Sequence, residues 1–179
     1  MALNSTMIRF NIKLSDVDRA IYETLELRVA KHPSESEVFL MARMIAYCLN
    51  VEEGIEFSGG IATPDDAAIY VKDLTGQILK WIDIGNPSPK RLHKASKAAK
   101  KVIIYTHRDP KILLDEMTGQ EIHKKSEIEI FSIPPRFLNP LSETLLKDNK
   151  WELLYNEGEL AITVNDKTYA TDVSQHSLV

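Results

Sequence analysis

An aspartate lies inside a strongly apolar segment of the sequence. Asp83 occurs in residues 77–85, Gln-Ile-Leu-Lys-Trp-Ile-Asp-Ile-Gly, whose apolar neighbours predict a largely buried strand. A carboxylate is costly to bury unless it is paired with a cation, hydrogen-bonded or bound to a metal. Asp83 is therefore either a cation ligand or the partner of a nearby donor such as Arg91, and the residues alone leave both interpretations open.

A second acid is expected beside Asp83 on a neighbouring strand. The turn residues 73–76, Asp-Leu-Thr-Gly, separate two strands and predict a hairpin. A three-residue bulged turn makes Asp65 the diagonal neighbour of Asp83 on the same face. A two-residue turn instead places Asp66 directly opposite Asp83, because a shift of one residue exchanges the two faces of a strand.

Acids on adjacent strands favour a hard divalent cation. Carboxylate oxygens together with water are the ligands that Mg²⁺ prefers, and Mn²⁺ accepts the same ligands. Glu35, near the start of a predicted helix, is a candidate third acid. Its alternative role is a favourable charge at the positive end of the helix dipole.

A run of basic residues follows the apolar strand after a short turn. Four lysines recur at steps of four, three and four, which places them on one face of a predicted helix: Lys90, Lys94, Lys97 and Lys101. Arg91 flanks that face. Such a stripe is a candidate contact with the phosphate backbone of DNA or RNA, or else an ordinary solvated face. A lysine from the first turns of this helix can also reach back towards the acids.

The remaining periodicity alternates between strands and helices. Apolar residues recur at every second position in 7–14 and 25–29, which predicts an N-terminal hairpin, and residues 152–164 predict a late hairpin. Helices are expected at 33–50, 88–101, 110–117 and 138–146, with strands at 102–105 and 128–133. This order predicts an α/β or α+β fold in which helices flank a mixed sheet.

The composition narrows the classes of protein. The 179 residues are 44% apolar and 27% charged, which predicts a single domain over 1–179 and excludes disordered, collagen-like and rod-like chains. Cys48 is the only cysteine, so we expect no internal disulfide and a reducing cytoplasm. No apolar run approaches the roughly 20 residues of a membrane span. The net charge of −4 confines any polyanion site to a local patch.

Several short motifs together resemble the YaeQ family of bacterial proteins. They are His32-Pro33-Ser34-Glu35, Arg43-Met44, Lys72-Asp73-Leu74-Thr75-Gly76 and Trp81-Ile82-Asp83-Ile84-Gly85. The resemblance implies a variant of the PD-(D/E)xK nuclease-like fold, a mixed central β-sheet flanked by helices, here with extra N- and C-terminal hairpins. In active members of that superfamily two acids bind Mg²⁺ and a lysine activates the attacking water.

Carried over by position, the resemblance makes Asp83 the second acid and Glu35 the helix glutamate, while Asp65 or Asp66 takes the place of the first acid. The lysine of the motif falls at Gly85, which has no side chain, and Lys94 is the candidate replacement. The expected function is a nuclease that depends on Mg²⁺ or Mn²⁺. The alternative is a non-catalytic module that keeps the fold and binds nucleic acid or a protein.

Overall fold

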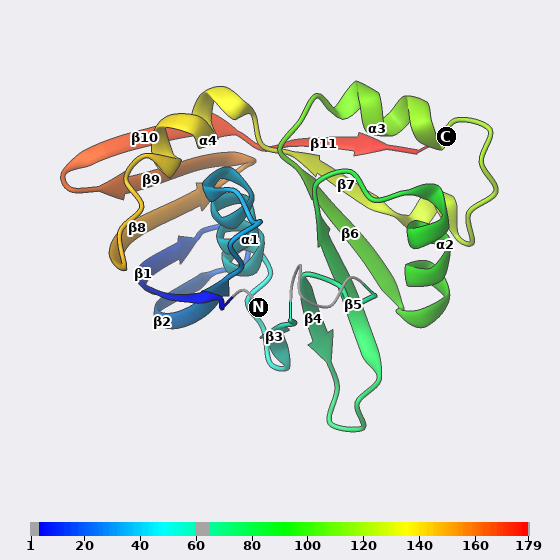
Figure 1. Cartoon of the computed structure of the whole chain (residues 1–179), viewed down its shortest axis with the longest axis horizontal. Helices are drawn as coiled ribbons and strands as arrows, with labels where there is room; N and C mark the ends of the chain where they lie inside the picture. The colour runs from blue at the N-terminus through cyan, green and yellow to red at the C-terminus, as the bar shows by residue number, and fades with distance from the viewer. Residues whose placement is uncertain (1–3, 60–64, 179) are drawn as a thin grey trace.

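The fold is mixed α+β, as predicted, but the extra terminal hairpins form a second mixed β-sheet beside the first. The computed structural model describes residues 4–59 and 65–178 and folds them into these sheets and four α-helices (Figure 1). One sheet has five strands in the order β10-β9-β8-β1-β2, and the other has six in the order β11-β7-β6-β5-β4-β3.

The elements have the following bounds. The five-stranded sheet contains β1 (Thr6–Asp16), β2 (Ile21–Lys31), β8 (Asp148–Asn156), β9 (Glu159–Val164) and β10 (Lys167–Asp172). The six-stranded sheet contains β3 (Ile55–Phe57), β4 (Ile69–Lys72), β5 (Ile78–Ile84), β6 (Lys101–Thr106), β7 (Glu129–Ser132) and β11 (Ser174–Ser177). The helices are α1 (Glu37–Leu49), α2 (Pro89–Ala98), α3 (Pro110–Met117) and α4 (Pro135–Ser142), with a 3₁₀ turn at Lys125–Glu127.

The two predicted hairpins join each other and, with β10 added at one end, form the five-stranded sheet. β1 pairs antiparallel with β2 and parallel with β8, so residues from both parts of the chain lie side by side. Along β1 the even-numbered apolar residues from Ile8 to Leu14 are buried and the residues between them are more exposed. The alternation read from the sequence therefore corresponds to one face on the core and one on solvent.

The main core lies between the two sheets. It is filled by α1 and α4 together with the inner faces of both sheets (Figure 1). Helix α1 begins at Glu37 rather than near residue 33, because the hydroxyl of Ser36 accepts a hydrogen bond from the Phe39 N–H at 3.1 Å and caps it. The Glu35 N–H instead bonds to the His32 carbonyl in a preceding turn.

A second core covers the other face of the six-stranded sheet, where α2 and α3 pack. Because successive residues of a strand face opposite sides, Trp81 and Asp83 face α2, whereas Ile82 and Ile84 belong to the main core on the α1 side. This alternation decides which predicted site residues can meet. Within the described residues, no helix is both long and apolar enough to cross a membrane.

The β4–β5 hairpin has a register that neither sequence alternative anticipated. The Asp73 N–H bonds to the Gln77 carbonyl at 3.0 Å, as in the longer of the two predicted turns. A bulge then shifts the pairing between Val71 and Lys72, and beyond it Ile69 lies opposite Ile82. One step further along the same register, Asp83 comes level with residue 68, not with 66 or 67.

Candidate functional site

Asp83 is held by an arginine from the start of α2. The guanidinium of Arg91 donates from Nε to Oδ2 at 2.7 Å and from Nη2 to Oδ1 at 3.0 Å, so both carboxylate oxygens are engaged. The Asp83 residue is only 3% exposed. Ser88 caps α2 by accepting from the Arg91 N–H, which fixes Arg91 in the first helical turn beside the end of β5. Of the two interpretations of Asp83, the structure therefore shows the arginine partner.

The same guanidinium also binds the segment that leads into β4. Its Nη2 donates to the main-chain carbonyl of Asp66, while the Asp66 carboxylate accepts from the Tyr70 hydroxyl at 3.2 Å. That hydroxyl in turn accepts from the Ala67 N–H at 3.1 Å. Burial is the largest influence on the Tyr70 side chain and raises its pKa. Arg91 thus ties the end of β5 to the residues before β4.

Two aromatic residues, Tyr70 and Trp81, complete this site, although the sequence indicated only a packing role for Trp81. The Arg91 guanidinium lies over the Trp81 ring at 5.6 Å from its centroid, and Tyr70 meets Trp81 edge-on at 5.5 Å. The Trp81 Nε1–H is buried without a hydrogen-bond acceptor among the described residues. The signal available in the sequence was that Trp81 precedes Asp83 by two positions and so shares its face.

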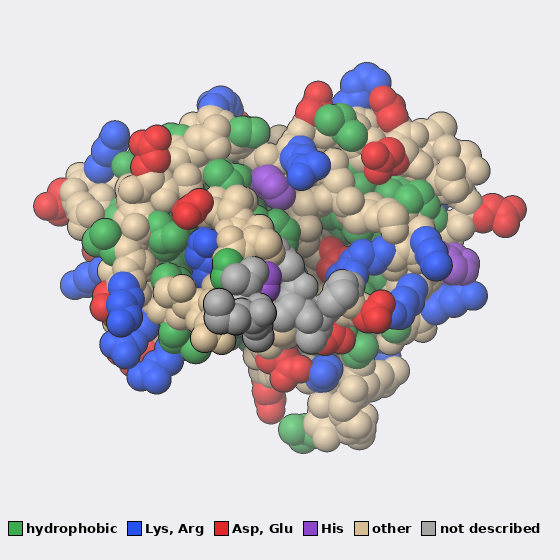
Figure 2. All heavy atoms as spheres, viewed as in Figure 1, with side chains coloured by type: hydrophobic (Ala, Val, Ile, Leu, Met, Phe, Trp, Pro, Cys, Tyr) green, Lys and Arg blue, Asp and Glu red, His purple; other side chains and the backbone are tan. Residues whose placement is uncertain are grey.

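The lysines of α2 lie at the edge of this group. Lys94 pairs with Asp65 at 3.6 Å, but their side chains are 57% and 95% exposed, so this ion pair contributes little to stability. Lys90 and Lys97 are also exposed. Figure 2 shows Lys and Arg side chains gathered over the part of the surface where α2 lies.

Lys101 does not belong to the lysine stripe. The helix ends at Ala98, and Lys101 is the first residue of β6. It shares a face with Ile103 and Tyr105, which pack towards the main core, and its ammonium pairs with Glu129 at 3.0 Å. Its side chain therefore lies on the opposite face of the six-stranded sheet from α2.

Glu35 is likewise separated from Asp83. It is 3% exposed, and its carboxylate accepts from Arg43 Nη2 at 2.9 Å on the α1 side of the six-stranded sheet. Burial has the largest effect on both groups, raising the pKa of Glu35 and lowering that of Arg43, against the attraction between them. Arg43 also donates to the Ala30 carbonyl, so this pair joins α1 to β2.

Among the described residues, the acids predicted as metal ligands are engaged by other protein groups. Both Asp83 oxygens point at a guanidinium, and Asp65 and Asp66 make their contacts with Lys94 and Tyr70. Across residues 4–59 and 65–178, no three His, Cys, Asp or Glu side chains are grouped as ligands. A cation such as Mg²⁺ or Mn²⁺ would have to displace Arg91, whose charge already occupies the space beside Asp83.

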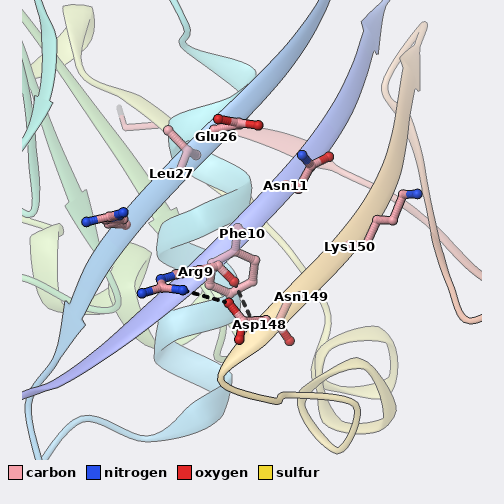
Figure 3. A pocket seen from close by; sticks show the side chains of 9 residues that line it. Arg9, Phe10, Asn11, Glu26, Leu27, Asp148, Asn149 and Lys150 are labelled. Carbon is pink, nitrogen blue, oxygen red and sulfur yellow. Dashed lines mark hydrogen bonds and ion pairs between the residues drawn. The ribbon is translucent and has the colours of Figure 1, made fainter.

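Two cavities lie away from this group. One of about 630 Å³ is on the outer face of the five-stranded sheet, where Glu26, Asn11 and Lys150 follow one another across β2, β1 and β8 (Figure 3). The other, of about 230 Å³, lies between the sheets, where Asn50 donates to the Tyr105 hydroxyl at 2.9 Å. Neither is lined by Asp83 or Arg91.

Comparisons with known proteins agree on one family. The uncharacterized YaeQ proteins of Escherichia coli K12 and Shigella flexneri are each 29% identical to this chain over 107 residues, which is 60% of this chain and 59% of theirs. The crystal structure of a YaeQ protein from Pseudomonas syringae superposes with a TM-score of 0.86 at 24% identity, covering 98% of this chain and 96% of the other. That from Xanthomonas axonopodis pv. citri gives 0.89 at 21% identity, covering 98% and 99%.

The two solved structures share the fold described above, with its mixed α+β arrangement. A model of the YaeQ protein family matches residues 1–173, almost the whole sequence. The protein belongs to the YaeQ family.

Proposed function

We propose that this protein binds the phosphate backbone of DNA or RNA through the exposed lysines of α2, on a nuclease-like fold in which Arg91 stands in place of a catalytic metal. The observation that carries the proposal is the double hydrogen bond from Arg91 to Asp83. An acid whose two oxygens are held by a guanidinium is neutralised within the protein. The exposed lysines of α2, of which Lys94 makes only a solvent-exposed pair with Asp65, can then attract an external anion.

The charge of α2 supports this proposal. The helix contains Lys90, Arg91, Lys94 and Lys97 and has no acidic residue in its first turn. Acids, not lysines, stabilise the positive N-terminal end of a helix. Two basic residues in the first turn therefore oppose helix stability. Arg91 is accounted for by Asp83, whereas Lys90, Lys94 and Lys97 form a local basic patch in a chain of net charge −4.

Binding is tested by fluorescence anisotropy with labelled single- and double-stranded DNA and RNA at several salt concentrations. Each lysine–phosphate contact adds about 0.9 to the slope of log K against log salt for duplex DNA. The Lys94→Glu/Lys97→Glu variant should therefore bind much more weakly and reduce that slope by about 2. Binding should be the same in EDTA and in Mg²⁺.

Lys147 and Lys150 provide a matched control, because both lysines are exposed and lie just before and within β8. A double variant with Lys147→Glu and Lys150→Glu carries the same total charge change as the α2 variant. If this control loses as much affinity as the α2 variant, the binding depends only on net charge and the proposed site is wrong. Absence of any salt-dependent binding by the wild-type protein also contradicts the proposal.

A nuclease dependent on Mg²⁺ or Mn²⁺ is the second candidate. It is favoured by Asp83 and Asp66, which both bind Arg91, and by Lys94, which pairs with Asp65 next to Asp66. In this alternative Arg91 releases Asp83. Isothermal titration with Mn²⁺ and cleavage assays distinguish the two: Mn²⁺ binding and cleavage that both disappear in Asp83→Asn favour the nuclease over the binding module.

A further inference from the structure

Within residues 4–59 and 65–178, no strand pairs with the outer edge of β2, which forms one end of the five-stranded sheet. Strand β2 has eleven residues and ends the strand order, with β1 as its neighbour on one side. Most of its side chains are exposed or partly exposed, and only Val29 is buried. Natural proteins usually shorten, cover or charge such an edge, because its free main-chain groups can pair with another strand.

The direction of the free main-chain groups follows from Arg9 on β1. The Arg9 N–H donates to the Lys147 carbonyl, and the Arg9 carbonyl accepts from Asn149, so both groups point towards β8. Arg28, which lies opposite Arg9, therefore points its own N–H and carbonyl away from β1. The Ala30 carbonyl, two residues further, indeed accepts from Arg43 and not from β1.

By the same alternation, four residues of β2 present main-chain groups at this edge: Tyr22, Thr24, Glu26 and Arg28. No hydrogen bond from the described part of the chain reaches the main-chain N–H or carbonyl of any of these four. An incoming antiparallel strand must use this set. If the incoming strand is β2 of a second copy, the ladder can form only in registers that place even-numbered residues opposite even-numbered residues.

The charges of β2 select one such register for a second copy of the same strand. When Leu27 lies on a two-fold axis, Glu26 of each copy faces Arg28 of the other, and Glu23 faces Lys31. Leu25 then faces Val29, so apolar and opposite-charge pairs alternate along the junction. Opposite charges and apolar pairs directly across strands are both stabilising.

The neighbouring registers lack this match. Moving the axis to Glu26 places two carboxylates opposite each other, and moving it to Arg28 places two guanidinium groups opposite each other. Like charges across a strand pair are destabilising. The same charges that repel an arbitrary strand therefore specify a copy of β2 in one alignment.

We propose that two copies of this protein associate through β2, antiparallel about Leu27, to form one continuous ten-stranded sheet. The cross-strand pairs between Glu26 and Arg28 fix the alignment. A closed two-fold contact of this kind pairs residues 23–31 of one copy with the same residues of the other. The lysine-bearing α2 packs on the other sheet, so the contact is separate from the proposed nucleic-acid site.

The mass of the full-length protein in solution tests the proposal by light scattering after size exclusion and by sedimentation over a range of concentrations. The wild type should approach twice the chain mass of 20.3 kDa. Glu26→Arg or Arg28→Glu alone creates two like-charge pairs and should raise the dissociation constant about tenfold or more. The exchange Glu26→Arg/Arg28→Glu restores opposite charges and should restore the dimer.

Two further variants separate pairing from general effects. Thr24→Pro removes an N–H that faces the free edge and should weaken the dimer without removing a bond to β1. Glu121→Arg repeats the charge change of Glu26→Arg at an exposed site outside the sheet and should leave the dimer intact. Circular dichroism confirms that each variant is folded.

A wild type that stays monomeric at every concentration overturns the proposal. So does a folded charge-exchange variant that stays as monomeric as the single variants, since rescue is the result that only this register predicts. Dimers that survive both single charge reversals and Thr24→Pro show that the copies meet elsewhere.

Discussion

His107 lies beside Gly85, the position to which the sequence resemblance would assign the lysine of a nuclease motif. The His107 Cε1 atom is 3.5 Å from the point that a Cβ on Gly85 would occupy, and the imidazole meets the Phe39 ring edge-on at 5.9 Å. Gly85 has a φ of +90°, a backbone conformation that residues with a side chain rarely adopt. The backbone conformation at the end of β5 therefore favours glycine over residues with a side chain.

Gly85→Lys should destabilise the protein and should not create metal-dependent cleavage. The positive φ alone costs about 1–2 kcal/mol for a residue with a Cβ, whereas contact with His107 at ordinary van der Waals distance adds little. Gly76→Lys is the matched control, because Gly76 has a φ of +86° and open space around it. Urea denaturation should show a loss for both variants and a larger one for Gly85→Lys, because Gly85 is buried and Gly76 is exposed. A Gly85→Lys protein as stable as the wild type contradicts this account.

His107 should make the protein less stable as the pH falls below about 6.5, the ordinary value for histidine. Burial and the nearby Arg108 lower the pKa of His107, so the unfolded state binds the proton more readily than the folded state. Stability is therefore present above the ordinary pKa and is lost as the pH falls below it. His107→Gln should lose less stability than the wild type between pH 7 and about pH 5.

The control for this pH effect is His123→Gln, which replaces an exposed histidine. Its melting temperature should follow the wild-type curve across the same pH range. If His107→Gln and His123→Gln behave alike, then His107 is not the source of the acid sensitivity.

Loss of Arg91 should be costly because it leaves the Asp83 carboxylate buried without a partner. Breaking a buried ion pair typically costs 3–5 kcal/mol, and since Arg91 is partly exposed we expect about 2–3 kcal/mol for Arg91→Ala. The double variant Asp83→Asn/Arg91→Gln should lose less than the sum of its single variants. Lys90→Ala, at an exposed position of the same turn, should change the free energy of unfolding by less than about 0.5 kcal/mol.

Cys48 should be unreactive in the folded protein. Its side chain is fully buried on α1, and burial raises the pKa of the thiol to about 12, so almost no thiolate is present at neutral pH. A thiol reagent such as Ellman's reagent should react with the denatured protein and not with the native one at pH 7.5. Rapid stoichiometric reaction under native conditions means that α1 opens readily.

Strands and helices with strong local periodicity were predictable from the sequence, whereas the pairing between strands distant in the chain was not. The N-terminal and late hairpins follow from residues such as Ile8 and Phe10, whose alternation has a physical cause visible in the sequence. Their union into a separate sheet rests on pairing such as Arg9 with Asp148, for which no local signal exists. The mixed α+β class and the extra terminal hairpins were therefore predictable, but the second sheet that these hairpins form was not.

The candidate site was predictable to a similar extent. The apolar surroundings of Asp83 indicated a buried acid that needs a partner, and Arg91 was one of the two interpretations offered. The spacing of Lys101 fitted the helical stripe, but a lysine fits a strand equally well, and the helix ends before it. The separation of Glu35 from Asp83 depends on which side of the six-stranded sheet α1 packs, a tertiary property that residue spacing does not encode.

The parallel junction between β1 and β8 has a consequence for how the nascent protein matures. During synthesis the first hairpin leaves the ribosome long before the segment that completes its sheet. Contacts so distant along the chain form slowly, because a large loop must close first. Until residues 148–164 emerge, both edges of that early hairpin stay open to foreign strands, so this is the stage at which a chaperone would protect the chain most effectively.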